Sequence, residues 1–107
     1  MKYYEGFSHT NSSDNEEDVV SLTSTSEEKK KINKILIFSE TNDGVMRWYV
    51  ERERVGTHYT NKATIQNALV FEVDRELAEG ETFKITLKNV TSGTNAAIVG
   101  AVEYEIL

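Results

Sequence analysis

The stretch TFKITLKN, residues 82–89, decides the fold class of this chain. Its apolar residues Phe83, Ile85 and Leu87 alternate with threonines and lysines, and a period of two is typical of a β-strand with one buried face. Gly80 lies in the turn just before this stretch, where glycine tolerates the backbone angles that a tight turn needs. We therefore predict a strand whose apolar side chains face a core and whose lysines face solvent.

The same alternation recurs through the rest of residues 32–107. It places Trp48 on a core face and the adjacent Tyr49 on the opposite, outer face. Five or six antiparallel strands separated by turn signals favour a small all-β fold, an antiparallel β-sandwich. The other predicted strands are KILIF (34–38), VMRWYVERERV (45–55), NALVFEVDREL (67–77) and IVGAVEYEIL (98–107), with residues 56–64 as a loop or a short edge strand.

Residues 1–31 differ in composition from the rest of the chain. Serine, threonine, asparagine and acidic residues dominate there, and such a segment buries too little apolar area to offset its ordering entropy. We predict an extended, flexible N-terminal arm over residues 1–31, followed by a sandwich domain over residues 32–107. The apolar residues of the arm are interpreted as anchors that bind a partner protein; they are Tyr3, Tyr4, Phe7, Val19, Val20 and Leu22.

Composition excludes several classes of function for these 107 residues. The chain has no cysteine, so it forms no disulfide and offers no thiolate to a metal. Its net charge is −6 and its basic residues are scattered, which argues against direct binding of nucleic acid. No apolar run is long enough for a membrane span, and no signal peptide is recognisable. Because the core is small, we expect oligomerisation to add stability.

No catalytic constellation is recognisable. The two histidines, His9 and His58, lie in polar segments without the ligand spacing of a metal site. The glycines of EGETFKITLKNVTSG lie in a hairpin, not between a strand and a helix, so they form no phosphate-binding loop. We predict that the protein is not an enzyme and has no catalytic residues, no metal and no cofactor.

The C-terminal part, residues 69–107, resembles the closing strands of small jelly-roll modules in virion structural proteins of the minor capsid, decoration or cement type. This resemblance implies a jelly-roll-like sandwich and a structural role in a virion assembled in the host cytoplasm. The implied partners are capsid subunits, further copies of this chain, or both, with a trimer as one option. The residues that carry the resemblance are Leu77 and Gly80 at a turn, Phe83, Ile85, Leu87 and Asn89 in a strand, Ser92, Gly93 and Thr94 in a loop, and Gly100, Val102, Tyr104 and Ile106 in the last strand.

Two alternative functions stay open. Acidic clusters at residues 14–18 and 72–81 suggest a small inhibitor that mimics nucleic acid. Alternatively, Tyr49 and Tyr59, together with Trp48, suggest a module that binds a carbohydrate or a receptor through surface aromatic residues.

Overall fold

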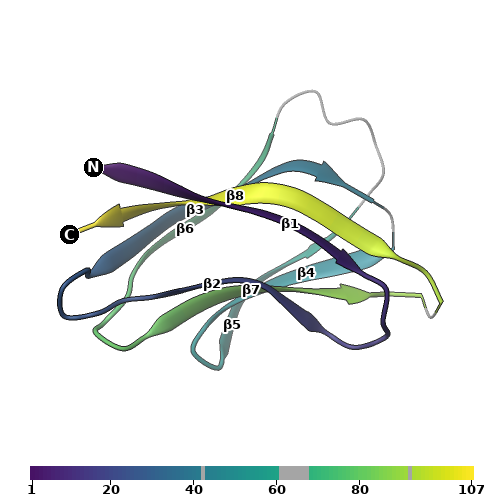
Figure 1. The fold of residues 1–107 in the computed structure, drawn as a ribbon, viewed down its shortest axis with the longest axis horizontal. Helices are drawn as coiled ribbons and strands as arrows, with labels where there is room; N and C mark the ends of the chain where they lie inside the picture. The colour runs from purple at the N-terminus through teal and green to yellow at the C-terminus, as the bar shows by residue number, and fades with distance from the viewer. Residues whose placement is uncertain (42, 61–67, 92) are drawn as a thin grey trace.

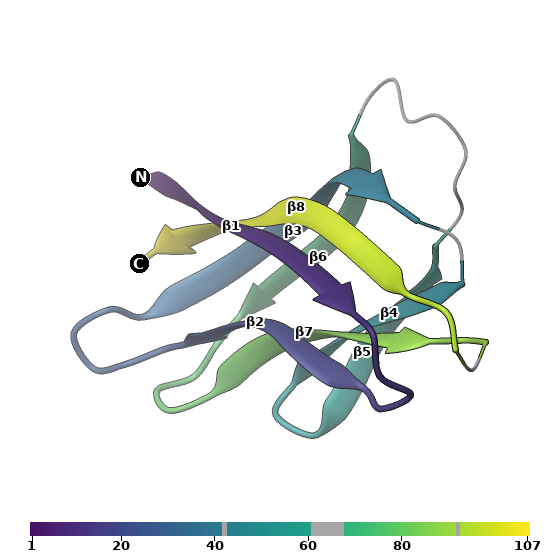
Figure 2. The same cartoon turned by 45° about the vertical axis from the view of Figure 1, so that its right-hand side comes forward.

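A computed structural model describes residues 1–41, 43–60, 68–91 and 93–107. Within these residues the chain forms eight strands. The described residues contain no helix that is long and apolar enough to cross a membrane. Figures 1 and 2 show the strands stacked as two layers. The strands are β1 (Lys2–Asn11), β2 (Glu17–Thr23), β3 (Lys30–Glu40), β4 (Gly44–Val50), β5 (Glu53–Tyr59), β6 (Leu69–Glu76), β7 (Thr82–Asn89) and β8 (Ala96–Ile106).

The strand order is that of a jelly roll. One four-stranded sheet has the order β1-β8-β3-β6 and the other has the order β2-β7-β4-β5. All pairings are antiparallel, and, apart from the hairpin of β4 and β5, neighbours in each sheet come from distant parts of the chain. Two four-stranded sheets connected in this way are the jelly-roll arrangement. The prediction of a small antiparallel β-sandwich is confirmed.

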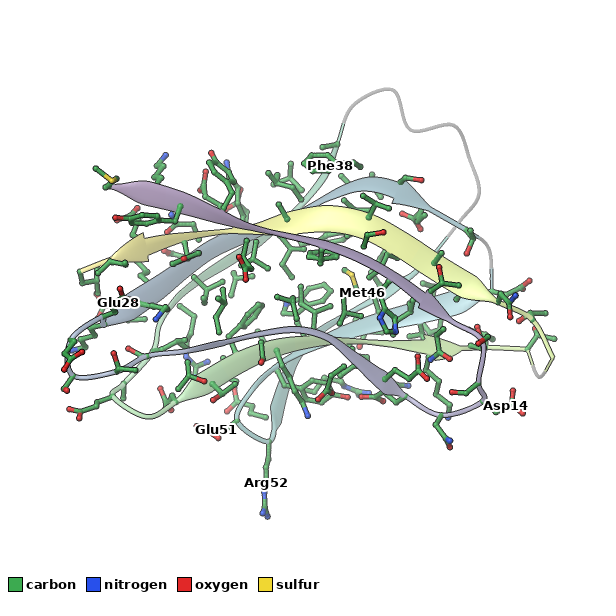
Figure 3. The ribbon with its side chains drawn as sticks, in the orientation of Figure 1. Asp14, Glu28, Phe38, Met46, Glu51 and Arg52 are labelled. Carbon is green, nitrogen blue, oxygen red and sulfur yellow. The ribbon has the colours of Figure 1, made fainter. Side chains whose placement is uncertain are left out.

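The core lies between the two sheets, where the alternating pattern placed it. Phe83, Ile85 and Leu87 are fully buried, as predicted for the stretch that decides the fold. Trp48 is also buried and packs on Phe71 with 5.3 Å between ring centroids, which confirms its predicted core position. Figure 3 labels Met46 between the layers, on the same face of β4 as Trp48.

The predicted arm over residues 1–31 is wrong. Strand β1 pairs with β8 along its whole length, and β2 pairs with β7. Phe7 and Leu22, interpreted as partner anchors, are each only 8% exposed and belong to the core. Both strands lie at sheet edges, so backbone pairing and a few inward side chains suffice to hold them. The predicted boundary between residues 31 and 32 falls inside β3.

Gly100 explains how the edge strand β1 is attached. It lies opposite Phe7 in the β1–β8 pairing, and a Cβ on Gly100 would overlap the backbone oxygen of Leu36 in β3. The same Cβ would lie 2.9 Å from Cζ of Phe7. The missing side chain therefore admits both the neighbouring strand and the Phe7 ring, as expected for a strand glycine that allows a close approach.

The single strand predicted over residues 45–55 is wrong, because β4 ends at Val50 and β5 begins at Glu53. For residues 56–59 the short edge strand, not the loop, is the correct alternative. The remainder of that predicted loop, residues 61–64, and Ser92 lie outside the described residues.

The folded surface is that of an ordinary monomer. Its accessible area is 6098 Å², and a folded monomer of this mass is expected to expose about 6,000 Å². Strand β1 completes one sheet and β2 completes the other, and the single folded chain has this accessible area with both strands in place. Oligomerisation stays a prediction.

Candidate binding surfaces

The outer face of sheet β1-β8-β3-β6 carries an apolar strip. We define the apolar strip as Leu36, Phe38, Val70, Val99 and Ala101. In the strand register Leu36 lies between Val70 and Ala101, so these side chains form one row across three strands. Phe38 is 50% exposed, Val70 48% and Val99 40%. Figure 3 shows Phe38 on the side of its sheet that faces away from the core.

Charged side chains of alternating sign cover the other half of this face. Glu103 lies between Tyr4 and Lys34 in the register. The Tyr4 hydroxyl donates a hydrogen bond of 2.8 Å to Oε1 of Glu103. Burial by itself would raise the pKa of Glu103, but the bond from Tyr4 and the charges of Lys34 and Lys2 hold that pKa below its ordinary value. A shallow hollow of 480 Å³ lies here, lined by Lys2, Asn33, Lys34, Glu72, Asp74, Glu103 and Glu105.

On the outer face of sheet β2-β7-β4-β5, Glu16 is the centre of a polar network. Its carboxylate accepts hydrogen bonds from Nη1 of Arg47, the hydroxyl of Tyr49 and the hydroxyl of Thr86, each 2.8 Å long. Burial opposes ionisation of Glu16, yet these three bonds and the charge of Arg47 lower its pKa. For Tyr49, burial and the bond to Glu16 both raise the pKa. The network fixes Arg47 and Tyr49 against the sheet.

The loop that carries Glu16 is held by two buried asparagines. Asn11 donates through Nδ2 to the backbone oxygen of Leu87 at 2.8 Å. Asn89 donates through Nδ2 to the backbone oxygens of Asn11 and Ser13. These bonds tie the end of β1 to β7, and so they place Glu16 above the sheet face.

A groove of 210 Å³ lies beside this network, which we call the tyrosine groove. Its floor is Val45, which is 4% exposed although it faces away from the core cluster. Val45 is paired with Lys88 on one side and with Tyr59 on the other. Tyr59 is 66% exposed. The groove is lined by Val45, Arg47, Tyr59, Lys88, Asn89 and Val90.

Several residues predicted to bind a partner lie in other places than expected. Tyr3 stacks on Tyr104 with 5.5 Å between ring centroids, and Tyr4 is bonded to Glu103, so neither projects from a free arm. Both tyrosines retain exposed surface, and their contact with a partner stays a prediction. Val19 and Val20 are partly buried and pack against the core.

The two tyrosines predicted as surface contacts do share a face. Tyr49 and Tyr59 lie on the outer side of sheet β2-β7-β4-β5, on neighbouring strands. Trp48 points to the core and is only 6% exposed, so it is not available to a surface ligand. Sequence reasoning missed the apolar strip, although Val70 and Val99 at outward positions of otherwise alternating strands were a signal for it.

The histidines form pairs with carboxylates. His58 lies 3.0 Å from Oε1 of Glu40, whose side chain is 1% exposed, and its ring packs on Phe71 at 4.8 Å. His9 lies 2.9 Å from Glu17 nearer the surface. Within the described part of the chain, no three histidine or acidic side chains gather in a way that could hold a metal ion.

Comparison with known proteins supports the fold and no family. No protein-family model matches the sequence, and no curated protein matches it. Among solved structures, the CBM36-1 domain of a multidomain xylanase from the hindgut metagenome of Trinervitermes trinervoides is similar, with a TM-score of 0.53 and 10% sequence identity. The similarity covers 98% of this chain and 98% of that chain. At this identity the two chains share a β-sandwich fold, and the likeness extends to nothing further.

Proposed function

We propose that this chain is a virion structural protein of the minor capsid, decoration or cement type, which attaches to a capsid through the apolar strip. The observation that carries this proposal is the exposure of Phe38, Val70 and Val99 together on one face of a jelly roll. Exposed apolar patches of this kind mark sites of protein contact. Jelly rolls are an architecture of viral capsid domains, and the closing strands resemble those of virion modules.

The form of the strip suits attachment to another protein. Its side chains stand on paired strands, so their backbone positions are fixed before binding and little entropy is lost. Phe38 supplies a large aromatic anchor, and anchors of this type contribute most of the energy in protein interfaces. The neighbouring charged half, with Tyr4 and Lys34, supplies the polar rim that surrounds the dry centre of a typical interface.

This proposal replaces the attachment route through a free arm. Because β1 is part of the sandwich, the N-terminal segment contributes Tyr4, which is bonded to Glu103, to the same outer face as the strip. Attachment therefore depends on the face of a folded sheet and needs no ordering of a flexible segment.

The alternatives receive different support. The acidic clusters do not form a continuous negative surface, since Lys31 lies 3.0 Å from Asp74 on the face that would have to mimic nucleic acid. The solved structure of similar fold is named as a carbohydrate-binding module, but its identity to this chain is too low to transfer a ligand. Carbohydrate binding needs an observation of its own, and the tyrosine groove provides one.

The proposal is tested by measuring how the recombinant chain binds to virus particles from which the native chain has been removed. The double variant Phe38→Ser/Val70→Ser should lose particle binding by at least about thirtyfold, because two contacts at the centre of an interface together contribute about 2 kcal/mol or more. The matched control is Val55→Ser, another partly exposed valine in an edge strand, which lies on the other sheet. Thermal unfolding checks that each variant is folded. Equal sedimentation of the double variant and the wild type would exclude the strip as the attachment surface.

A further inference from the structure

The tyrosine groove combines an exposed aromatic ring with polar side chains on a rigid floor. Tyr59 extends from the edge strand β5, and Arg47 is fixed by its bond to Glu16. The volume of 210 Å³ lies below the roughly 300–1,000 Å³ of pockets for drug-sized ligands, which suits a single small ring. Aromatic faces of tyrosine pack well on rings that are apolar on one side and polar at the edge.

Two unsatisfied polar atoms belong to residues of this groove. Of the buried side-chain nitrogen and oxygen atoms in the described residues, Nε of Arg47 and Oδ1 of Asn89 have no hydrogen-bond partner. Asn89 itself is 5% exposed. An unsatisfied buried polar atom costs about 1–3 kcal/mol, so such atoms are rare in native proteins and call for an explanation. The first is a donor and the second an acceptor, and ligand hydroxyls offer a partner for each kind.

The charge of the groove favours an anionic ligand. Lys30, Lys31 and Lys84 each form an ion pair, whereas Lys88 forms none with the described residues. The charge of Arg47 is offset by Glu16, so Lys88 supplies the excess positive charge of the groove. In a chain of net charge −6, a positive groove attracts an anion locally although the whole protein does not.

We propose that the tyrosine groove binds a carboxylate-bearing sugar. The sugar ring packs on Tyr59, its carboxylate pairs with Lys88, and its hydroxyls bond Arg47 and Asn89. Both of these polar atoms are covered in the free protein, so bonding to them requires a rotamer change at the groove surface, a motion that takes nanoseconds. Because the groove and the apolar strip lie on different sheets, the protein can bind the sugar while the strip is occupied.

Titration with saccharides, followed by amide chemical shifts, tests this proposal on the full chain. The probes are oligogalacturonate and sialyllactose, which carry the carboxylate on different sugars, together with neutral galacto-oligosaccharide and lactose as their uncharged counterparts. We expect at least one acidic probe to bind about tenfold more tightly than its neutral counterpart, with shifts centred on Val45 and Lys88. The acidic probe that binds identifies the sugar as a uronic acid or a sialic acid.

Variants of matched chemistry locate the site. Tyr59→Ala should weaken binding about tenfold, since loss of one stacking contact of 1–3 kcal/mol corresponds to that change. Lys88→Gln should remove the preference for the acidic probe. The controls are Tyr4→Ala, an exposed tyrosine of the other sheet, and Lys84→Gln, a lysine of the same strand, and both should bind as the wild type does.

Three results would overturn the proposal: no shift with any probe, equal affinity for acidic and neutral probes, or unchanged affinity in Tyr59→Ala. Tighter binding of a tetraglutamate peptide than of every acidic sugar would also overturn it, because it would assign the groove to acidic protein segments. Particle attachment is measured with variants of the apolar strip, so failure of either proposal leaves the other intact.

Discussion

Replacing Phe7 by alanine should severely destabilise the sandwich. The ring is 8% exposed, belongs to the core cluster and lies opposite Gly100. Truncating a buried phenylalanine costs about 3–5 kcal/mol, because transfer energy is lost and a cavity is left. A glycine partner has no side chain to move into that cavity, so the cost should lie in the upper half of the range. The free energy of unfolding of a native domain is about 5–15 kcal/mol in total, so this loss brings the variant close to unfolding.

Urea unfolding followed by tryptophan fluorescence measures this cost. Trp48 lies in the same core and reports loss of packing. Ser8→Ala is the control: Ser8 is the exposed neighbour of Phe7 on β1, and its loss should change the free energy of unfolding by less than about 0.5 kcal/mol. If Phe7→Ala is within about 1 kcal/mol of the wild type, β1 does not hold the sandwich together. Packing of Phe7 against Gly100 would then contribute little to stability.

Three further predictions concern packing, pH and a buried pair. Gly100→Ala should lower the free energy of unfolding by about 1–3 kcal/mol, because its Cβ would overlap a carbonyl of β3, whereas Gly6→Ala, whose nearest neighbour is 3.9 Å away, should be close to neutral. Glu16 has a lowered pKa, so its contribution to stability is present above its ordinary pKa of 4.5 and is lost as pH falls through the folded-state pKa. The difference in free energy of unfolding between wild type and Glu16→Gln should therefore shrink on acidification. A constant difference between pH 7 and pH 3 would contradict this. His58→Ala removes one hydrogen-bond partner of Glu40, whose side chain is 1% exposed, and should cost about 1–3 kcal/mol, while His9→Ala, whose partner is 37% exposed, should cost under about 1 kcal/mol in the same urea assay.

The alternation of apolar and polar residues in the sequence predicted those strands that have one apolar and one polar face. In β7 every second side chain from Phe83 to Leu87 is apolar, and the structure buries all of these. The same reasoning placed Trp48 inside and Tyr49 outside. These strands lie inside their sheets, where one face must be apolar, so the pattern in the sequence and the burial in the fold agree.

The edge strands could not be found in this way. Along β1 most residues are exposed, and Phe7 is the apolar side chain that it buries in the core. Its position depends on pairing with β8, nearly the whole length of the chain away, and on the space that Gly100 leaves. A polar composition is compatible with an edge strand because the paired backbone, not the side chains, makes most of the contacts.

The candidate surfaces depend on register as much as on residue type. Leu36, Val70 and Ala101 become one row because three strands pair in a particular alignment, which no single stretch of sequence specifies. The tyrosine groove likewise joins Lys88 of β7 to Tyr59 of β5 across Val45. Tyr59 itself was recognised from the sequence, whereas its polar neighbours were not.

The most direct test of the proposed function is where the native protein sediments. An antibody raised against the recombinant chain would be used to follow the protein through a density gradient of material from its natural source, with subunits of the particle identified in the same fractions. We expect the chain to sediment with intact particles, and the recombinant wild type to rebind stripped particles while Phe38→Ser/Val70→Ser does not. Recovery of the native chain only at the top of the gradient, with the mass of a free monomer, would contradict the assignment as a virion structural protein.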